Sequence, residues 1–343
     1  MQTRVYNLAI LGFGNVGRAL ARHLQVKTEE LCERYDIEWR LTGVATRRMG
    51  WLADPGGLDV ASLLDGRIPG KKAVAGGDVR TWLKATQADV LFELTSTNPR
   101  TGQPAIEHVR AALEQGMHVV TANKGTVMHA YHELSTLARE KGKRFLFEAT
   151  VMAGAPLFSL FQSSLPAVKL QRVRALFNGT CNVVIAEMEQ GKSFEQAVKR
   201  AQELGIAETD PSDDIDGWDA AIKAGIVANI LMGEPVSMEQ IERVGVRGLT
   251  QEMVQEARAA GTRYKLVSTI ERTASGQVQA SVQPERLSAD DPLASVGPGG
   301  LLTHFEMDMV PGLTVTLHVP MTETAGPDVT AYDVLADFIR AVG

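Results

Sequence analysis

The sequence predicts an α/β fold in two domains, an N-terminal doubly wound parallel sheet followed by an α+β domain. Three observations support this: an apolar strand runs into a glycine-rich turn and a helix, strand and helix patterns then alternate, and the alternation is lost after Val151. A chain of 343 residues is long enough to form two hydrophobic cores. We expect the first domain at 1–147, completed by a C-terminal helix at 326–343, and the second domain at 148–325.

The first element is a predicted strand at 5–11, and GFGNVG and a helical pattern at 18–25 follow it directly. Strand, glycines and helix in this order are typical of a dinucleotide-binding Rossmann fold. Gly12 would make the tight turn, Gly14 would let backbone N–H groups approach a pyrophosphate, and Gly17 would let the helix pack closely on the strand. The fingerprint also contains Phe13, Asn15 and Val16. A merely glycine-rich turn is the alternative.

The second strand is predicted at 38–45, and the nature of its end bears on the cofactor. An NAD site commonly has a carboxylate there, but this chain continues with Arg47 and Arg48. Two cations favour the 2′-phosphate of NADP, unless both arginines are simply solvated. We expect the glycine-rich segment 49–80 to be irregular, with Lys71 and Lys72 as further phosphate contacts.

Strand–helix alternation then resumes, which indicates a parallel sheet with its ligands at the carboxyl ends of the strands. That rule makes Thr95, Asn123 and Lys124 candidate site residues, although Lys124 could equally be an ordinary loop lysine. The expected strands are 88–94, 118–123 and 143–150, and the expected helices are 107–115 and 129–142.

After Val151 the pattern predicts an α+β domain without a regular βαβ rhythm. The final helix, at 329–342, is expected to return to the first domain. The expected strands are 170–177, 264–272, 277–283, 301–309 and 313–319, and the expected helices are 194–204, 216–232 and 250–261.

An unusual acidic stretch, 204–224, ends in a lysine within an apolar run. Asp213, Asp214 and Asp216 suit a helix cap and first turn, where backbone N–H groups favour negative charge. Asp219 and Lys223 are then i,i+4 neighbours on one helical face. Their apolar surroundings place the pair in an interior or a cleft, where a lysine is a candidate proton donor. A buried structural pair and a solvent-exposed pair are the alternatives.

The composition is that of a soluble globular protein, with 44% hydrophobic and 22% charged residues. A net charge of −6 without a basic stripe argues against nucleic acid or an anionic membrane as the main partner. Two widely separated cysteines, Cys32 and Cys181, favour a reducing cytoplasm over a disulfide scaffold. The sequence contains no apolar run of about 18 residues that could span a bilayer.

Two other functions compete with a lysine-assisted dehydrogenase. Cys181 follows Asn178 at a predicted helix start, as a thiolate nucleophile would in a phosphorylating semialdehyde dehydrogenase, but no histidine is placed as its base. A non-catalytic dinucleotide sensor would keep Gly12, Gly14 and Gly17 and would have no need of Lys223.

Several stretches together resemble homoserine dehydrogenase, the NAD(P)-dependent enzyme that interconverts aspartate 4-semialdehyde and homoserine in threonine, methionine and isoleucine biosynthesis. They occur in the family's order and span nearly the whole chain. The long acidic motif that ends in lysine is the most specific of them. The stretches are GFGNVG (12–17), VVTANKG (119–125), FEATVMAGAP (147–156), FNGTCN (177–182), LGIAETDPSDDIDGWDAAIK (204–223) and AGPDVTAYDVLADFI (325–339).

The resemblance implies roles for individual residues. Lys223 would donate a proton to the carbonyl oxygen, Asp219 would position that lysine, and Lys124 would lie at both cofactor and substrate. Substrate contacts would come from Glu208, Asp219, Asp214, Gly179 and Lys124. Cofactor contacts would come from the fingerprint, Arg47, Arg48, Thr95, Lys124 and Gly326.

The resemblance also implies a homodimer and a sodium ion held by Glu148, Val151, Ala153 and Ala155, chiefly through backbone oxygens. Two features depart from the family's pattern. Ala155 replaces the second glycine of an AGG turn, and His304 stands where the family's pattern would have an asparagine. Because the chain stops after Gly343, we expect neither a C-terminal regulatory ACT module nor threonine feedback through one.

Overall fold

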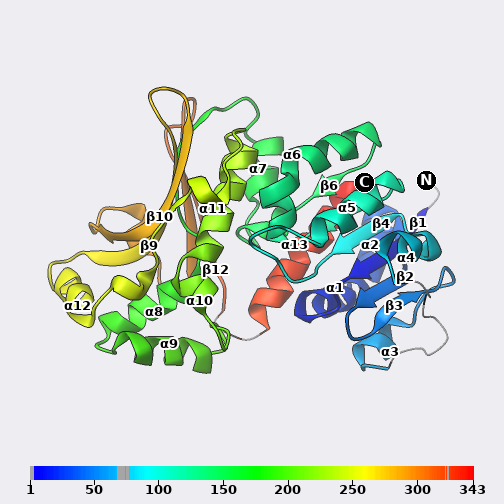
Figure 1. Ribbon diagram of the computed structural model, residues 1–343, viewed down its shortest axis with the longest axis horizontal. Helices are drawn as coiled ribbons and strands as arrows, with labels where there is room; N and C mark the ends of the chain where they lie inside the picture. Colours follow the sequence, from blue (N-terminus) through cyan, green and yellow to red (C-terminus); the bar gives the residue numbers. More distant parts are fainter. Residues whose placement is uncertain (1–3, 68–73, 75–76, 321, 323) are drawn as a thin grey trace. The chain divides into compact units, whose positions relative to one another are not determined.

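The computed structural model describes residues 4–67, 74, 77–320, 322 and 324–343. The chain divides into two compact units, Met1–Gly154 with Pro327–Gly343, and Ala155–Gly326. Among the described residues no helix has the length and apolar character needed to cross a membrane. Figure 1 shows the elements of both units.

The first unit contains a six-stranded sheet in the order β3-β2-β1-β4-β5-β6. This is the strand order of the Rossmann fold, so the predicted doubly wound α/β domain is confirmed. Only the edge strand β3 runs antiparallel to its neighbour. The strands are β1 (Arg4–Leu11), β2 (Ile37–Thr46), β3 (Gly50–Ala53), β4 (Val90–Glu93), β5 (His118–Thr121) and β6 (Phe145–Leu146).

Helices cover this sheet, and the last of them comes from the far end of the chain. Phe338 of α13 packs edge-on against Phe92 of β4, with ring centroids 5.7 Å apart, in a core that also contains Leu8 and Ile10. The helices are α1 (Asn15–Val26), α2 (Thr28–Tyr35), α3 (Val60–Leu64), α4 (Val79–Thr86), α5 (Ala105–Glu114), α6 (Lys124–Glu140) and α13 (Ala325–Val342), with a 3₁₀ turn at η1 (Glu148–Thr150).

Three predictions for the first unit were wrong in detail. The segment 49–80 is not simply irregular, because it contains β3 and α3 and the start of α4. Lys71 and Lys72 lie outside the described residues. The element that contains the helix expected from residue 129 begins at Lys124, because Asn123 accepts a hydrogen bond from the Gly125 N–H and caps it. Non-helical angles at Ala130 (φ −140°, ψ 18°) divide α6, so the expected helix corresponds to its second part. The strand expected at 143–150 is limited to β6 because the chain turns into η1.

The second unit contains another six-stranded sheet, in the order β12-β11-β7-β9-β10-β8. Its pairs are antiparallel except for the short β8, so the predicted α+β character is confirmed. The strands are β7 (Leu170–Leu176), β8 (Glu242–Arg243), β9 (Arg263–Arg272), β10 (Val278–Leu287), β11 (Gly300–Met307) and β12 (Leu313–His318).

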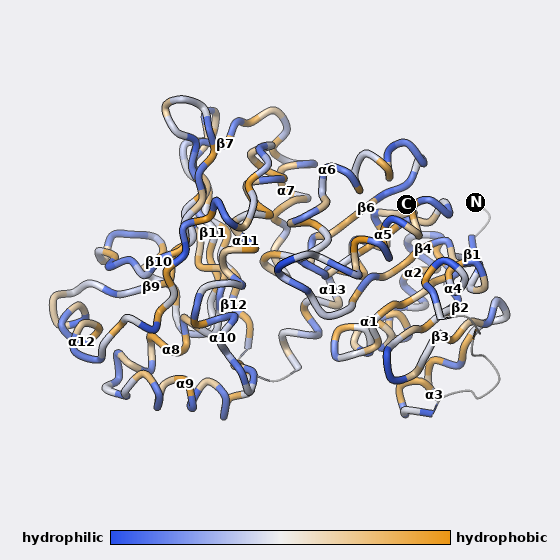
Figure 2. Tube along the Cα trace, in the orientation of Figure 1, coloured by the Kyte–Doolittle hydropathy of each residue, from blue (hydrophilic) through white to orange (hydrophobic). Residues whose placement is uncertain are grey.

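The helices of the second unit differ from prediction at the acidic stretch. The helix expected at 216–232 is α11 and begins two residues later, because Gly217, with a φ of +80°, separates it from the short α10. The polar and apolar turns of α9 alternate in Figure 2, as expected of an amphipathic surface helix. The helices are α7 (Leu157–Ser163), α8 (Gly179–Glu189), α9 (Phe194–Glu203), α10 (Ser212–Ile215), α11 (Trp218–Leu231) and α12 (Gln251–Ala259), with 3₁₀ turns η2 (Met238–Gln240), η3 (Val246–Gly248) and η4 (Pro292–Ser295).

Candidate active site

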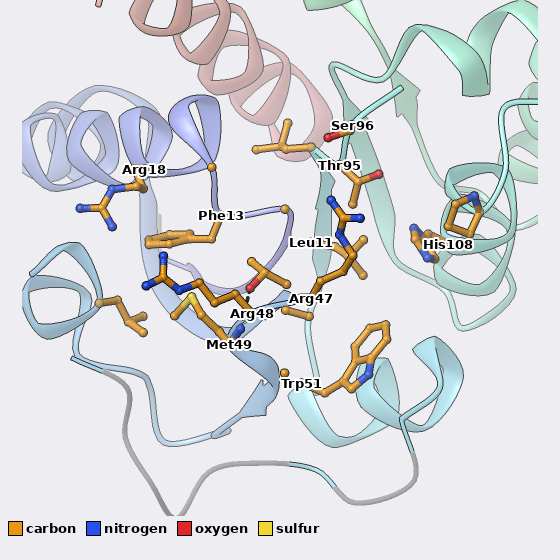
Figure 3. A pocket seen from close by; sticks show the side chains of 18 of the residues that line it. Leu11, Phe13, Arg18, Arg47, Arg48, Met49, Trp51, Thr95, Ser96 and His108 are labelled. Atoms are coloured by element: carbon orange, nitrogen blue, oxygen red, sulfur yellow. Dashed lines mark hydrogen bonds between the residues drawn. The ribbon is translucent and has the colours of Figure 1, made fainter. Parts of the chain in front are cut away.

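A pocket of about 990 Å³ lies in the first unit, at the carboxyl ends of β1, β2 and β4 (Figure 3). This is where the chain order of the sheet reverses, between β1 and β4, and open α/β sheets bind their ligands at such a point. The predicted cofactor residues that line the pocket are Gly12, Phe13, Gly14, Arg47, Arg48 and Thr95. Asn15, Val16, Gly17, Lys124 and Gly326 are not among its lining residues.

The glycine turn has the geometry that a dinucleotide needs. Gly12 has a φ of +100°, and a Cβ added there would lie 2.4 Å from the backbone of Leu94. A Cβ on Gly17 would lie 2.3 Å from the carbonyl oxygen of Gly12. A Cβ on Gly14 would meet no protein atom within 4 Å, so the space beside Gly14 is open. No described side chain caps α1, which leaves its first backbone N–H groups available to an anion.

Three arginines surround this turn. Figure 3 shows the Arg48 side chain directed toward Phe13, whereas Arg47 extends toward Thr95. Arg18 of α1, which the sequence analysis did not single out, lies with its guanidinium carbon 6.0 Å from the centre of the Phe13 ring. Arg18 also donates a hydrogen bond to the carbonyl of Leu64. The pocket therefore combines an apolar surface with positive charge, as a phosphorylated nucleotide requires.

A buried carboxylate lies behind the pocket wall, and the sequence analysis missed it. Glu93 ends β4 and is fully buried. Its Oε1 accepts a hydrogen bond from the Thr95 hydroxyl at 2.5 Å and lies 3.2 Å from Nδ1 of His108. Its Oε2 has no hydrogen-bond partner within the described part of the chain. Because Thr95 and His108 both line the pocket, Glu93 orients two polar groups there. A charged residue inside the apolar strand 88–94 was the available signal.

Lys124 is the first residue of α6, directly after its cap Asn123. The Asn123 side-chain amide donates a hydrogen bond to the carbonyl of Thr95 at 3.1 Å. One buried asparagine thus links the start of α6 to the loop that follows β4. This contact supports the expectation that Thr95 and Lys124 belong to the same end of the sheet.

The turn expected to hold sodium is fastened by two carboxylates of α13. The backbone N–H of Glu148 donates to Asp337 at 2.8 Å, and that of Gly154 donates to Asp333 at 2.7 Å. Burial raises the pKa of both aspartates to about 7. The Glu148 carboxylate lies 3.2 Å from Arg340. Sequence patterns gave no reason to expect these contacts, because they join residues about 180–190 positions apart.

The lysine at the end of the acidic stretch lies in the second unit, on α11. Its Nζ is 2.7 Å from Oδ2 of Asp219 and donates to the carbonyl of Phe177 at 2.8 Å. The exposed fractions of the Lys223 and Asp219 side chains are only 14% and 16%. The interpretation as a solvent-exposed pair is therefore wrong. An ammonium held by a carboxylate and a carbonyl in a largely buried setting is a suitable proton donor.

Asp214 lies close to this pair, and Asn178 connects them. The Asn178 amide donates to both Asp214 and Asp219, and the Thr180 hydroxyl donates to Asp214 at 2.9 Å. Burial, together with the charge of Asp219, raises the pKa of Asp214. The aspartates expected to cap the lysine's helix do not do so, since Gly217 precedes α11 and Asp213 and Asp214 lie in α10.

Two other predicted substrate residues, Glu208 and Gly179, lie at exposed or open positions. Glu208 is exposed, and no interaction of its carboxylate with Lys223, Asp214 or Asp219 occurs among the described residues. Gly179 is the first residue of α8, and a Cβ added to it would meet nothing within 4 Å. The backbone at Gly179 therefore borders open space.

The Cys181 side chain is inconsistent with a thiolate nucleophile. Cys181 is fully buried, and its thiol donates to the carbonyl of Asp214 at 3.3 Å. Burial, reinforced by the charges of Asp214 and Asp219, raises the pKa of the thiol well above its usual range. A protonated, enclosed thiol cannot attack a carbonyl carbon.

Two family models together match most of the chain. The model described as "Homoserine dehydrogenase, NAD binding domain" matches residues 12–148, and the one described as "Homoserine dehydrogenase" matches residues 156–339. An NAD(+)-dependent homoserine dehydrogenase from Pseudomonas canavaninivorans is 35% identical over 98% of this chain and 96% of its own. A homoserine dehydrogenase from Methanocaldococcus jannaschii is 34% identical over 97% of this chain and 98% of its own. A solved hyperthermophilic archaeal homoserine dehydrogenase in complex with NADPH is similar with a TM-score of 0.81 and 29% identity, over 98% of both chains.

Proposed function

The chain belongs to the homoserine dehydrogenase family of NAD(P)-dependent oxidoreductases, and from this premise we propose that it interconverts L-aspartate 4-semialdehyde and L-homoserine with Lys223 as the proton donor. The observation that carries the proposal is the largely buried ammonium of Lys223, held by Asp219 at 2.7 Å and the Phe177 carbonyl at 2.8 Å. A dinucleotide, when bound, supplies or accepts the hydride. The reaction belongs to the biosynthesis of threonine, methionine and isoleucine.

The protein's part in the reaction is to hold the proton and orient the substrate. In the reductive direction, Lys223 polarises the aldehyde carbonyl and protonates the oxygen as negative charge develops on it. Asp219 holds the ammonium in place through its carboxylate. Glu208 and Asp219 hold the substrate's own ammonium group, and Asp214, Gly179 and Lys124 complete the substrate contacts. Such orientation contributes much of the rate in reactions of this kind.

We assign most nucleotide contacts to the first unit and most substrate contacts to the second. Gly12, Gly14 and Gly17 shape the turn that receives the pyrophosphate, as their Cβ geometry supports. The assigned cofactor contacts are Phe13, Asn15, Val16, Arg47, Arg48, Thr95, Lys124 and Gly326. A phosphorylating mechanism through Cys181 is disfavoured because that thiol is buried and protonated.

The direct test is a spectrophotometric assay of homoserine oxidation with NADP and with NAD in parallel. Reduction of the nicotinamide should depend on homoserine and should need no phosphate. The sensor alternative predicts dinucleotide binding without homoserine-dependent reduction. Strictly phosphate-dependent reduction of the nicotinamide with aspartate 4-semialdehyde as the substrate would instead support the thiol mechanism, because a thiolate adds to an aldehyde and not to an alcohol.

For the cofactor, we expect a lower KM for NADP than for NAD. Arg47 and Arg48 both line the pocket at the end of β2, where the 2′-phosphate would lie, and none of the described residues that line it is a carboxylate. Replacing Arg48 with alanine should raise the KM for NADP at least about tenfold, the loss expected for one charge-assisted hydrogen bond. The KM for NAD should change little, because NAD lacks that phosphate.

The KM of the Arg47→Ala variant for NADP, measured in the same assay, will show how much each arginine contributes to binding the 2′-phosphate. Arg34→Ala, on the exposed part of α2, is the matched control and should alter neither constant. A wild-type enzyme with the lower KM for NAD would contradict the preference, as would an Arg47→Ala, Arg48→Ala double variant that keeps the wild-type KM for NADP.

We also propose a sodium ion in the turn formed by Glu148, Val151, Ala153 and Ala155. Hard cations prefer oxygen ligands, which the backbone carbonyls of this turn can supply. The carbonyl of Ala155 already accepts the Leu157 N–H at 2.8 Å, and Arg340 partly neutralises Glu148, so the donor set suits a weakly held monovalent ion. Equal thermal stability in sodium and in tetramethylammonium buffers would argue against it.

We further propose that the protein is a homodimer and that it is located in the cytoplasm. The edge strands β12 and β8 offer backbone groups through which a second copy could extend the sheet. Sedimentation at a mass of 37.1 kDa, that of one chain, would refute the dimer. Both cysteines are free, which is consistent with a reducing compartment, and fractionation of the source cells would test this.

A further inference from the structure

Asn178, which precedes α8, forms hydrogen bonds through both the oxygen and the nitrogen of its carboxamide. Its Oδ1 accepts the backbone N–H of Cys181 at 2.9 Å and so caps α8. Because that contact needs an acceptor, the other end of the amide is the NH₂ group. Nδ2 donates to Oδ1 of Asp214 at 2.6 Å and to Oδ2 of Asp219 at 3.1 Å. Asn178 is only 4% exposed, so this geometry is fixed by its surroundings.

The same turn also holds the lysine. Oδ2 of Asp219 accepts from Asn178 and lies 2.7 Å from Nζ of Lys223. Lys223 in turn donates to the carbonyl of Phe177, the residue before Asn178. The adjacent residues Phe177 and Asn178 therefore hold the pair together: the Phe177 carbonyl accepts from Lys223, and the Asn178 side chain donates to Asp219.

Two carboxylates so close together repel each other when both are ionised. Asp214 faces Asp219 and Lys223 of α11 and Cys181 of α8, and the Thr180 hydroxyl also donates to it. Asp216, which follows α10, is held by an ion pair with Arg247 and by a hydrogen bond from Arg243 to its backbone carbonyl. Asn178 is thus the described side chain that donates hydrogen bonds to both Asp214 and Asp219.

We propose that Asn178 is a positioning residue that lets Asp214 and Asp219 remain ionised together and keeps Asp219 directed at Lys223. This inference rests on the proposed role of Lys223 as proton donor. An amide is suited to the position because it donates to two anions without adding charge. Without these donors, Asp214 and Asp219 would share a proton, and fewer molecules would hold the ionised Asp219 that the lysine needs.

The test is the pH dependence of kcat in Asn178→Asp. This substitution preserves the shape of the side chain and its capping oxygen but replaces the donor NH₂ with a third negatively charged acceptor. We expect kcat near neutral pH to fall at least about tenfold and the acid limb of the profile to move to higher pH by about one unit or more. The affinity for NADP should be unchanged. Asn178→Ser also caps α8 and adds no charge, and it should move the limb in the same direction by less.

Asn182→Asp is the matched control on the same helix. Asn182 is 1% exposed, and its side chain donates to the carbonyl of Gly300 at 2.9 Å. The new carboxylate would therefore be as buried as that of Asn178→Asp, but it would not replace a donor to Asp214 or Asp219. It should leave the acid limb in place, even if it lowers thermal stability. The proposal would be overturned if the acid limb of the kcat–pH profile stayed at its wild-type position in both Asn178 variants. It would also be overturned if Asn182→Asp moved that limb as far as Asn178→Asp does.

Lys223→Ala in the same assay separates this inference from the proposed function. Near wild-type turnover of that variant would reject Lys223 as the proton donor, and with it the reason for positioning Asp219. Loss of turnover in Lys223→Ala together with an unchanged Asn178→Asp profile would reject the role of Asn178 alone.

Discussion

Lys223→Ala is expected to lower kcat at least about a hundredfold, the lower end of what a general acid contributes. The lysine is largely buried and held at 2.7 Å from Asp219, so solvent cannot easily replace it as a proton source. Without the ammonium, charge that develops on the carbonyl oxygen is neither stabilised nor neutralised. Steady-state kinetics of homoserine oxidation measure the loss. Dinucleotide affinity, from titration of NADPH fluorescence, should be unchanged because the pocket lies in the other unit.

Two controls distinguish proton transfer from loss of charge or of folding. Lys223→Arg keeps a cation but cannot release its proton at accessible pH, so its activity should also be low. Lys199→Ala removes an exposed lysine of α9 and should leave kcat unchanged. Thermal unfolding of each variant reports whether Asp219, left without its cation, destabilises the fold. Activity of Lys223→Ala within a few-fold of wild type would contradict the mechanism.

Gly12→Ala is expected to destabilise the first unit and abolish dinucleotide binding. The new Cβ would lie 2.4 Å from backbone atoms of Leu94, which cannot rotate away as a side chain could. The φ of +100° at this position adds strain for any residue with a Cβ. Together these effects should cost about 2–4 kcal/mol. Thermal unfolding should show a Tm lowered by about 5–15 °C.

Gly14→Ala is the matched substitution two residues later. Its Cβ would meet no protein atom within 4 Å, so the only strain comes from a ψ of −149°, and the Tm should fall by much less than in Gly12→Ala. Its affinity for the dinucleotide should still fall, because the methyl group would occupy the space through which a pyrophosphate approaches the backbone. A stable Gly12→Ala, or a Gly14→Ala that binds NADP as tightly as wild type, would contradict this account of the turn.

The sequence by itself determined those features that local patterns encode. An apolar run followed by GFGNVG predicted β1, the glycine turn and α1, because residues adjacent in the chain build all three. The strands of the second unit, except the short β8, followed from apolar–polar alternation. The contact of Asp219 with Lys223 followed from helical spacing alone, since both lie on α11.

Only the tertiary structure decided how these pieces meet. Asn178 reaches Asp214 across 36 positions and Asp219 across 41, and Asp337 reaches the N–H of Glu148 across 189. No periodicity records such contacts, because the sheets and helices that bring distant residues together are set by burial of apolar faces rather than by local spacing. The acidic motif was visible in the sequence, but the amide that connects its carboxylates was visible only in the fold.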